Sequence, residues 1–191
     1  MFRGEGDRST EQLAVRNELE RQADIYRGLG VSKDAIMQLV APRPDRLPRE
    51  LKIPIVTLGT SVDLNRQADF AGIKTYYDLS CGHDIAGGIT YDEPHLIWVQ
   101  DGSKYRGKSV ERVRRILKRN ERPATQSDGI AIAIVNLGVH GFRDDHFIDL
   151  PGTAVEPNFA PALEQFGGEL KLLRSWAGDA HPHWGSASCW G

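Results

Sequence analysis

Residues 129–139 read GIAIAIVNLGV, and this apolar run decides what kind of fold the chain can adopt. A helix that is hydrophobic on every face is buried in a protein core. The β-branched residues of the run would also suit a buried strand, so its periodicity does not choose between the two. Thr125 and Asp128 stand at its start with the spacing of a capping box, which favours a helix. We therefore expect one buried apolar helix, with the other elements packed around it.

The composition indicates a soluble globular protein with a single core. The chain has 191 residues, of which 40% are hydrophobic and 26% charged, and its net charge of −2 names no partner by itself. The apolar run is far shorter than the roughly 20 residues of a membrane span, and the N-terminal MFRGEGDRSTEQ lacks the apolar segment of a secretory signal. We expect a cytoplasmic protein with no membrane partner, in which Cys81 and Cys189 stay reduced rather than forming a disulfide.

Short apolar runs predict strands on both sides of the buried helix. They are IPIVTLG (53–59), KTYYDLS (74–80) and HLIWVQDG (95–102) before it, and HFIDLPG (146–152) and ELKLLRSW (169–176) after it. A further helix is predicted from Ser109 through Lys118, because its apolar residues recur on one face. The fold class that follows is α+β. We expect a single compact core domain over residues 53–191, with a mixed or antiparallel sheet.

Residues 1–41 predict a helical arm ahead of this domain. A capping box at Ser9 opens a run in which apolar residues recur at helical spacing until Gly28, and Ser32 opens a second, short helix. Residues 42–52 form a proline-rich linker between the arm and the domain. Helices this short are marginal alone, so the arm must dock on something. One hypothesis is a structural homo-oligomer assembled through residues 9–40.

Reactive side chains gather in two short segments, DLSCGHD (78–84) and the C-terminal HPHWGSASCWG (181–191). Thiolate sulfur and imidazole nitrogen both suit zinc, and the candidate ligands are Cys81, His83, His181 and His183. The two segments lie about a hundred residues apart, so only the fold can bring these ligands together. A zinc site is therefore a hypothesis that depends on their proximity.

The same segments permit a thiol-dependent enzyme. Cys81 or Cys189 would be the nucleophile, with His83 or a tail histidine as the base and Asp84 or Asp179 orienting that base. Packing is the commoner role of a buried cysteine or tryptophan. The alternative is therefore a C-terminal plug that its two tryptophans hold in the core.

A second polar cluster follows the apolar run, within HGFRDDHFIDLPG (140–152). Carboxylates flanked by histidines can hold a divalent cation or perform acid–base chemistry. The alternative is an ordinary polar loop between a helix and a strand. The cluster consists of His140, Arg143, Asp144, Asp145, His146 and Asp149.

Positive charge is concentrated in residues 104–122, which carry nine Lys and Arg against two Glu. Helical spacing aligns Arg112, Arg115 and Arg119 in one stripe, with Lys108 beside it. Such a stripe on an otherwise acidic chain favours nucleic acid or an acidic protein surface as the partner. Binding of single-stranded nucleic acid through base stacking has little support, because stacking needs several aromatic side chains and the segment holds one. The alternatives are a solvated helical face and internal partners for acidic loops.

Four sequence motifs in the C-terminal half resemble those of a known family: IWVQDG, DGIAIAI, IDLPGT and HWGSASCWG. Residues 96–191 resemble an uncharacterised bacterial domain family that is mainly actinobacterial, and the clearest motif is the terminal GSASC (185–189). The resemblance implies that the tail belongs to the folded domain. It implies no activity and no cofactor.

The leading hypothesis for function is binding, of nucleic acid or an acidic partner, through residues 104–122. The sequence lacks the short motifs of nucleotide-binding loops, α/β-hydrolases, zinc proteases and thioredoxin-like proteins, which lowers the odds of those classes. The two alternatives are the metal- or thiol-dependent enzyme and the homo-oligomer described above.

Overall fold

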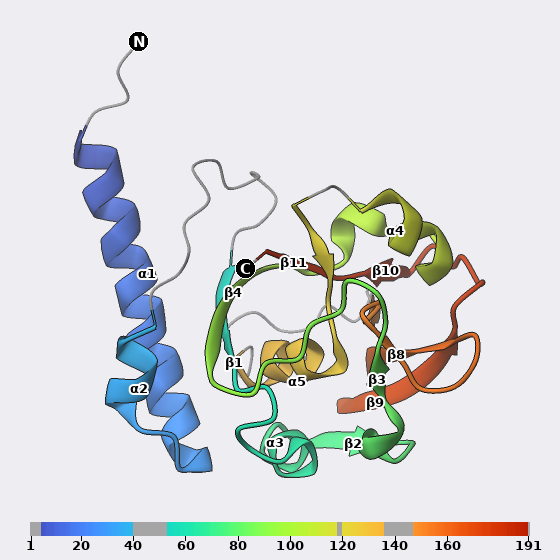
Figure 1. The fold of residues 1–191 in the computed structure, drawn as a ribbon, viewed down its shortest axis with the longest axis horizontal. Coiled ribbons are helices and arrows are strands. Elements are labelled where there is room, and N and C mark those ends of the chain that lie inside the picture. Colours follow the sequence, from blue (N-terminus) through green and yellow to red (C-terminus); the bar gives the residue numbers. More distant parts are fainter. Residues whose placement is uncertain (1–4, 40–52, 118–119, 136–146, 191) are drawn as a thin grey trace.

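Residues 129–135 of the apolar run lie in a buried helix in the middle of the molecule, and residues 136–139 lie outside the described chain (Figure 1). The structure is a computed structural model that describes residues 5–39, 53–117, 120–135 and 147–190, and for residues 5–12 and 53 the backbone alone. Helix α5 (Gln126–Val135) is buried along its whole length. The helix prediction is therefore confirmed. The predicted linker, residues 42–52, lies outside the described residues.

A four-stranded antiparallel sheet packs beside α5. Its order is β1-β4-β11-β5, so β1 and β5 are its edge strands. The strands are β1 (Ile53–Thr57), β4 (His95–Gln100), β5 (Arg122–Pro123) and β11 (Ser188–Trp190). The predictions for 53–59 and 95–102 are thus confirmed, and the C-terminal tail pairs with β4 in the middle of the sheet.

A five-stranded mixed sheet lies on the other side of α5 from β1 and β4 (Figure 1). Its strand order is β10-β6-β8-β9-β2. The β10–β6 and β2–β9 pairs are parallel, and the other pairs are antiparallel. The strands are β2 (Ile73–Thr75), β6 (Phe147–Asp149), β8 (Phe159–Phe166), β9 (Glu169–Trp176) and β10 (Trp184–Ser186). A short third pair joins β3 (His83–Asp84) to β7 (Thr153–Ala154). The molecule is therefore α+β with mixed and antiparallel sheets, as the sequence predicts.

Two parts of the strand prediction are wrong. The segment 74–80 leaves the sheet after Thr75, because the Asp78 carboxylate accepts the backbone N–H of Ser80 and starts the 3₁₀ turn η2 (Leu79–Cys81). Strand β8 has no counterpart among the predictions. It forms a hairpin with β9 through Gly167 and Gly168, which both have positive φ, as a tight two-residue turn requires.

Serine caps begin two short helices where the sequence places them, but the prediction for Ser9 is wrong, because α1 starts at Glu5 and Ser9 lies inside it. The Ser32 hydroxyl accepts the N–H of Ala35 at the start of α2 (Lys33–Met37), and Ser109 caps α4 (Val110–Ile116) in the same way. The remaining helical elements are α1 (Glu5–Tyr26), η1 (Arg27–Leu29), α3 (Leu64–Phe70) and η3 (Ser103–Tyr105).

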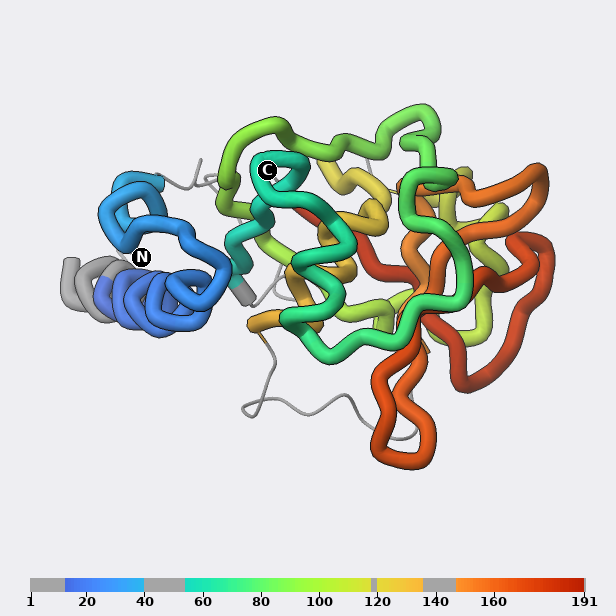
Figure 2. The backbone as a smooth tube through the Cα atoms, turned by 90° about the horizontal axis from the view of Figure 1, so that it is seen from below, coloured from blue at the N-terminus to red at the C-terminus, as the bar shows by residue number. Residues whose placement is uncertain are grey.

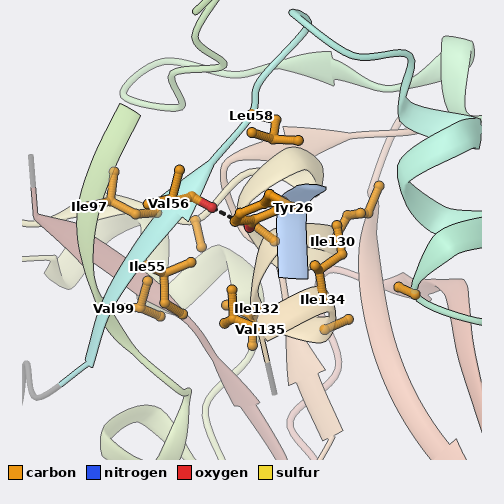
Figure 3. Packing of buried hydrophobic residues seen from close by; sticks show 14 of the residues in the cluster. Tyr26, Ile55, Val56, Leu58, Ile97, Val99, Ile130, Ile132, Ile134 and Val135 are labelled. Carbon is orange, nitrogen blue, oxygen red and sulfur yellow. Dashed lines mark hydrogen bonds between the residues drawn. The ribbon is translucent and has the colours of Figure 1, made fainter. Parts of the chain in front are cut away.

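Helix α1 closes the open edge of β1. The Gln22 side chain behaves like a neighbouring strand: its Nε2 donates to the Pro54 carbonyl at 2.7 Å and its Oε1 accepts the Val56 N–H at 2.8 Å. The Tyr26 hydroxyl donates to the Val56 carbonyl, the contact drawn in Figure 3. An unpaired strand edge invites association with other chains, and these three bonds satisfy it internally.

The N-terminal arm therefore docks on this chain's own core. Leu19, Ala23, Tyr26 and Ile36 are buried and belong to the same hydrophobic cluster as α5 and β1. Figure 2 shows the blue α1 and α2 against the teal strand β1, at one end of the molecule. Figure 3 shows the close packing of α1, β1, β4 and α5 around Tyr26.

Replacing Gln22 by methionine tests this edge contact. The variant Gln22→Met keeps the volume but leaves the Pro54 carbonyl and the Val56 N–H buried without partners, so unfolding in urea should show a loss of about 2–4 kcal/mol. The matched control Gln38→Met changes an exposed side chain and should cost less than about 0.5 kcal/mol. Equal losses in the two variants would contradict the contact.

Candidate functional site

The C-terminal tail connects the two sheets. Strand β10 pairs with β6, strand β11 pairs with β4 and β5, and Ala187 joins them. The Ala187 N–H donates to the Asp149 carbonyl at 2.9 Å, and its carbonyl accepts the N–H of Ala124 at 3.2 Å. Cys189 is fully buried, as a plug would be, whereas Trp184 and Trp190 are only half-buried. The tryptophans thus lie at the borders of the core, and Trp184 faces a pocket.

The buried side of the tail contacts an ion pair at the start of α5. The Arg122 guanidinium donates to both carboxylate oxygens of Asp128, at 2.6 and 3.2 Å. The same carboxylate accepts the N–H and the hydroxyl of Thr125, at 2.8 and 3.0 Å. Negative charge is favourable at a helix N-terminus, so Asp128 both caps α5 and holds the strand β5 that carries Arg122.

Cys189 lies opposite Arg122 in the sheet, and the Asp128 carboxylate is near enough to act on its thiol. Burial raises the pKa of this thiol well above its usual range, and the neighbouring carboxylate adds to the rise. The thiolate is the nucleophilic form of cysteine. Cys189 is therefore held protonated at neutral pH, which suits packing and not nucleophilic catalysis.

Two aromatic rings cover the outer side of the ion pair. The Tyr91 ring lies 5.4 Å from the Arg122 guanidinium, and His95 stacks on Tyr91 with centroids 3.9 Å apart. Burial, and next the Arg122 charge, lower the pKa of His95, so this imidazole is neutral at pH 7. The sequence offered one signal for the cluster, the capping-box spacing of Asp128; the roles of Tyr91 and His95 arise only from the fold.

The structure does not gather the residues proposed for zinc or catalysis. Cys81 and His83 are exposed, and His83 lies in the β3–β7 pair. Asp84 accepts the hydroxyls of Thr90 and Thr153. His181 and His183 are exposed neighbours, with ring centroids 5.4 Å apart. Within the described residues, no three His, Cys, Asp or Glu side chains lie together as a metal site requires.

The open side of the tail borders a cavity of about 430 Å³. Its inner wall includes the buried Asp149, whose carboxylate accepts the Ser175 hydroxyl at 3.0 Å. Burial raises the pKa of Asp149 to about 7, against the smaller opposing effect of that hydrogen bond. The other lining residues are Phe147, Trp176, Asp179, Ala180, His181 and Trp184. Of the predicted polar cluster 140–149, residues 140–146 lie outside the described chain, so Asp149 and not its histidines can be placed.

Several cations of the segment 104–122 have partners inside the molecule. Lys104 pairs with the buried Glu121, and Arg122 with Asp128. Arg114 donates to the carbonyls of Pro151 and Thr153 at 2.9 and 3.2 Å. Arg106 donates to the Pro182 carbonyl at 3.4 Å and Arg115 to the Glu111 carbonyl at 3.3 Å. Internal partners, one of the alternatives for this charge, are therefore present for five of the cations.

The predicted stripe lies on the outer face of α4. Arg112 and Arg115 are exposed and Lys108 is half-buried, while Val110 and Val113 fill the inner face. Arg119 lies outside the described residues. We call Lys108, Arg112 and Arg115 the basic face.

Searches of protein-family models, of curated proteins and of solved structures each found no match to this chain. The resemblance of residues 96–191 to a bacterial domain family stays a prediction. In the part of the chain that the structure describes, no helix combines the length and the apolar character of a membrane span.

The two thiols should differ sharply towards an alkylating reagent. With iodoacetamide and mass spectrometry, the native protein should gain one label, at the exposed Cys81, and a second only after unfolding in urea, because Cys189 is buried and protonated. The variant Cys81→Ser should leave the native protein unlabelled. Rapid native labelling of Cys189 would contradict the buried position of the tail.

Proposed function

We propose that the protein acts by binding nucleic acid through the basic face. One observation carries the proposal. The chain pairs Lys104 and Arg122 with its own acids and Arg114 with its own carbonyls. It leaves the side chains of Arg112 and Arg115 exposed on one side of α4, where Arg115 keeps one hydrogen bond to the Glu111 carbonyl of its own helix. Guanidinium groups match phosphate oxygens with paired hydrogen bonds, so such a surface attracts a phosphate backbone.

The surroundings of the basic face favour a double strand. The aromatic side chain of this segment, Tyr105, is buried and donates its hydroxyl to Glu121 at 2.7 Å. It therefore offers no stacking surface for an unpaired base. Contacts with the phosphates of a duplex need only the charges, and they are independent of sequence.

The two other hypotheses have less support. A thiol enzyme would need a reactive cysteine beside a base, whereas burial keeps Cys189 protonated and Cys81 lies exposed in a turn. A homo-oligomer built through residues 9–40 would have to use the outer side of α1, because Gln22 and Tyr26 bind β1 of the same chain.

Binding to duplex DNA at several salt concentrations tests the proposal. Fluorescence anisotropy should show affinity for a labelled duplex that falls as salt rises. The double variant Arg112→Gln/Arg115→Gln should bind more weakly and lower the slope of log K against log salt by about 2, since each phosphate contact contributes about 0.9.

The double variant Arg16→Gln/Arg27→Gln is the matched control, because it removes the same charge from exposed positions on α1 and η1. It should bind the duplex as the parent protein does. Equal loss of DNA affinity in both double variants would mean that binding depends on net charge and not on the basic face, which would contradict the proposal. Binding of poly-glutamate but not of DNA would replace nucleic acid by an acidic protein as the partner.

A further inference from the structure

The cavity beside the tail has aromatic walls that meet at a corner. The rings of Phe147 and Trp184 lie edge to face, with centroids 5.5 Å apart and planes at 80°. Trp176 forms another wall, and its ring lies edge to face with that of Phe159, with centroids 5.2 Å apart and planes at 88°. Neighbouring strands pair Phe147 with Trp184 and Phe159 with Trp176, so the backbone sets the positions of these rings.

The charged groups of the same cavity are mainly acidic. Asp149 projects from β6, and Asp179 and His181 come from the segment between β9 and β10. Strands β9 and β10 contribute Ser175, Trp176 and Trp184, which do not titrate near neutral pH, and β8 contributes no lining residue. Within the part of the chain that the structure describes, no Lys or Arg side chain lines the cavity. The cavity therefore combines π faces with carboxylates.

We propose that this cavity binds a small organic cation, a methylated or otherwise substituted ammonium group, with Asp149 as its counter-ion. The faces of aromatic rings carry partial negative charge, and tryptophan attracts cations most strongly. A substituted ammonium fits better than a metal ion, because its methyl groups bury apolar surface against the rings. Its size also suits the space: a cavity of about 430 Å³ lies in the range of small-molecule sites and far exceeds one metal ion.

Exposure of the aromatic walls supports the proposal. Trp176 leaves 47% of its surface exposed, although it belongs to a regular strand at the border of the core. A ligand in the cavity would cover this surface. An anionic ligand would face two carboxylates, whereas a cation would compensate the ionised form of the buried Asp149.

The buried carboxyl makes the affinity depend on pH. Because the pKa of Asp149 is about 7 in the empty cavity, both protonation states are populated at neutral pH, and a cation binds the ionised state. Affinity should therefore rise about tenfold from about pH 6 to about pH 8, as the ionised fraction rises through that pKa. Asp179 and His181 are the other titratable lining groups, and variants of both separate their contributions from that of Asp149.

The probe for this site is choline, compared with 3,3-dimethylbutan-1-ol, which has the same shape with carbon in place of the charged nitrogen. The four tryptophan indole N–H signals in the NMR spectrum report where it binds. Choline should shift the signals of Trp176 and Trp184 and leave those of Trp98 and Trp190, on β4 and β11, as internal references. The alcohol should bind about tenfold more weakly or worse.

Variants then assign the effect to the cavity. Trp176→Leu should weaken choline binding about fivefold or more, whereas Phe166→Leu, which also removes an exposed aromatic ring but outside the cavity, should not. Asp149→Asn should weaken binding about tenfold and remove the dependence on pH. Unchanged Trp98 and Trp190 signals confirm that each variant is folded.

Three results would overturn the proposal. Equal binding of choline and the alcohol would mean an apolar site without selection for charge. Tighter binding of sulfate or glucose at the same signals would mean an anion or sugar site. Unshifted Trp176 and Trp184 signals at millimolar choline would mean that the cavity takes no ammonium group.

Discussion

The buried ion pair between Arg122 and Asp128 is the interaction on which the fold depends. Helix α5 is apolar from Gly129 to Val135, so the hydrophobic effect places it in the core, where its N-terminal N–H groups have no water to bind. The Thr153 hydroxyl accepts the N–H of Gln126, and the Thr125 hydroxyl accepts that of Asp128. The Asp128 carboxylate accepts the Thr125 N–H in return and brings its charge into the core. A buried charge requires a partner, and Arg122 supplies one from β5. The pair thereby ties the helix to the sheet.

The same constraint explains the density of reactive residues in the C-terminal tail. Strand β11 passes between the ion pair and β4, and the small side chains before Cys189 allow the tail to cross from one sheet to the other. Burial there makes the cysteine inert. The histidine and tryptophan that precede it lie outside the core and border the cavity of Asp149. The C-terminal end of the tail therefore packs in the core, whereas its first residues present aromatic and polar groups to the cavity.

Sequence patterns predicted what local chemistry controls. The capping residues Ser32 and Ser109 precede their helices, Thr125 and Asp128 bond to each other at the start of α5, and apolar runs predict β1, β4, β6 and β9. Such patterns did not predict the contacts between segments that are distant in the sequence. The edge contact of Gln22 with β1 and the stacking of His95 on Tyr91 over Arg122 depend on tertiary packing, which no spacing encodes. The proposed zinc site required two segments to meet, and the described structure holds no such group of ligands.

A double-mutant cycle on Arg122 and Asp128 tests the central interaction most directly. Unfolding in urea would be measured for the parent, Arg122→Met, Asp128→Asn and the double variant. Each single change should cost about 3–5 kcal/mol, because it leaves a buried group without its partner, and the double variant should cost at least about 2 kcal/mol less than the two combined. Costs that add to within about 0.5 kcal/mol would show that the two residues act independently and would contradict the role of the pair.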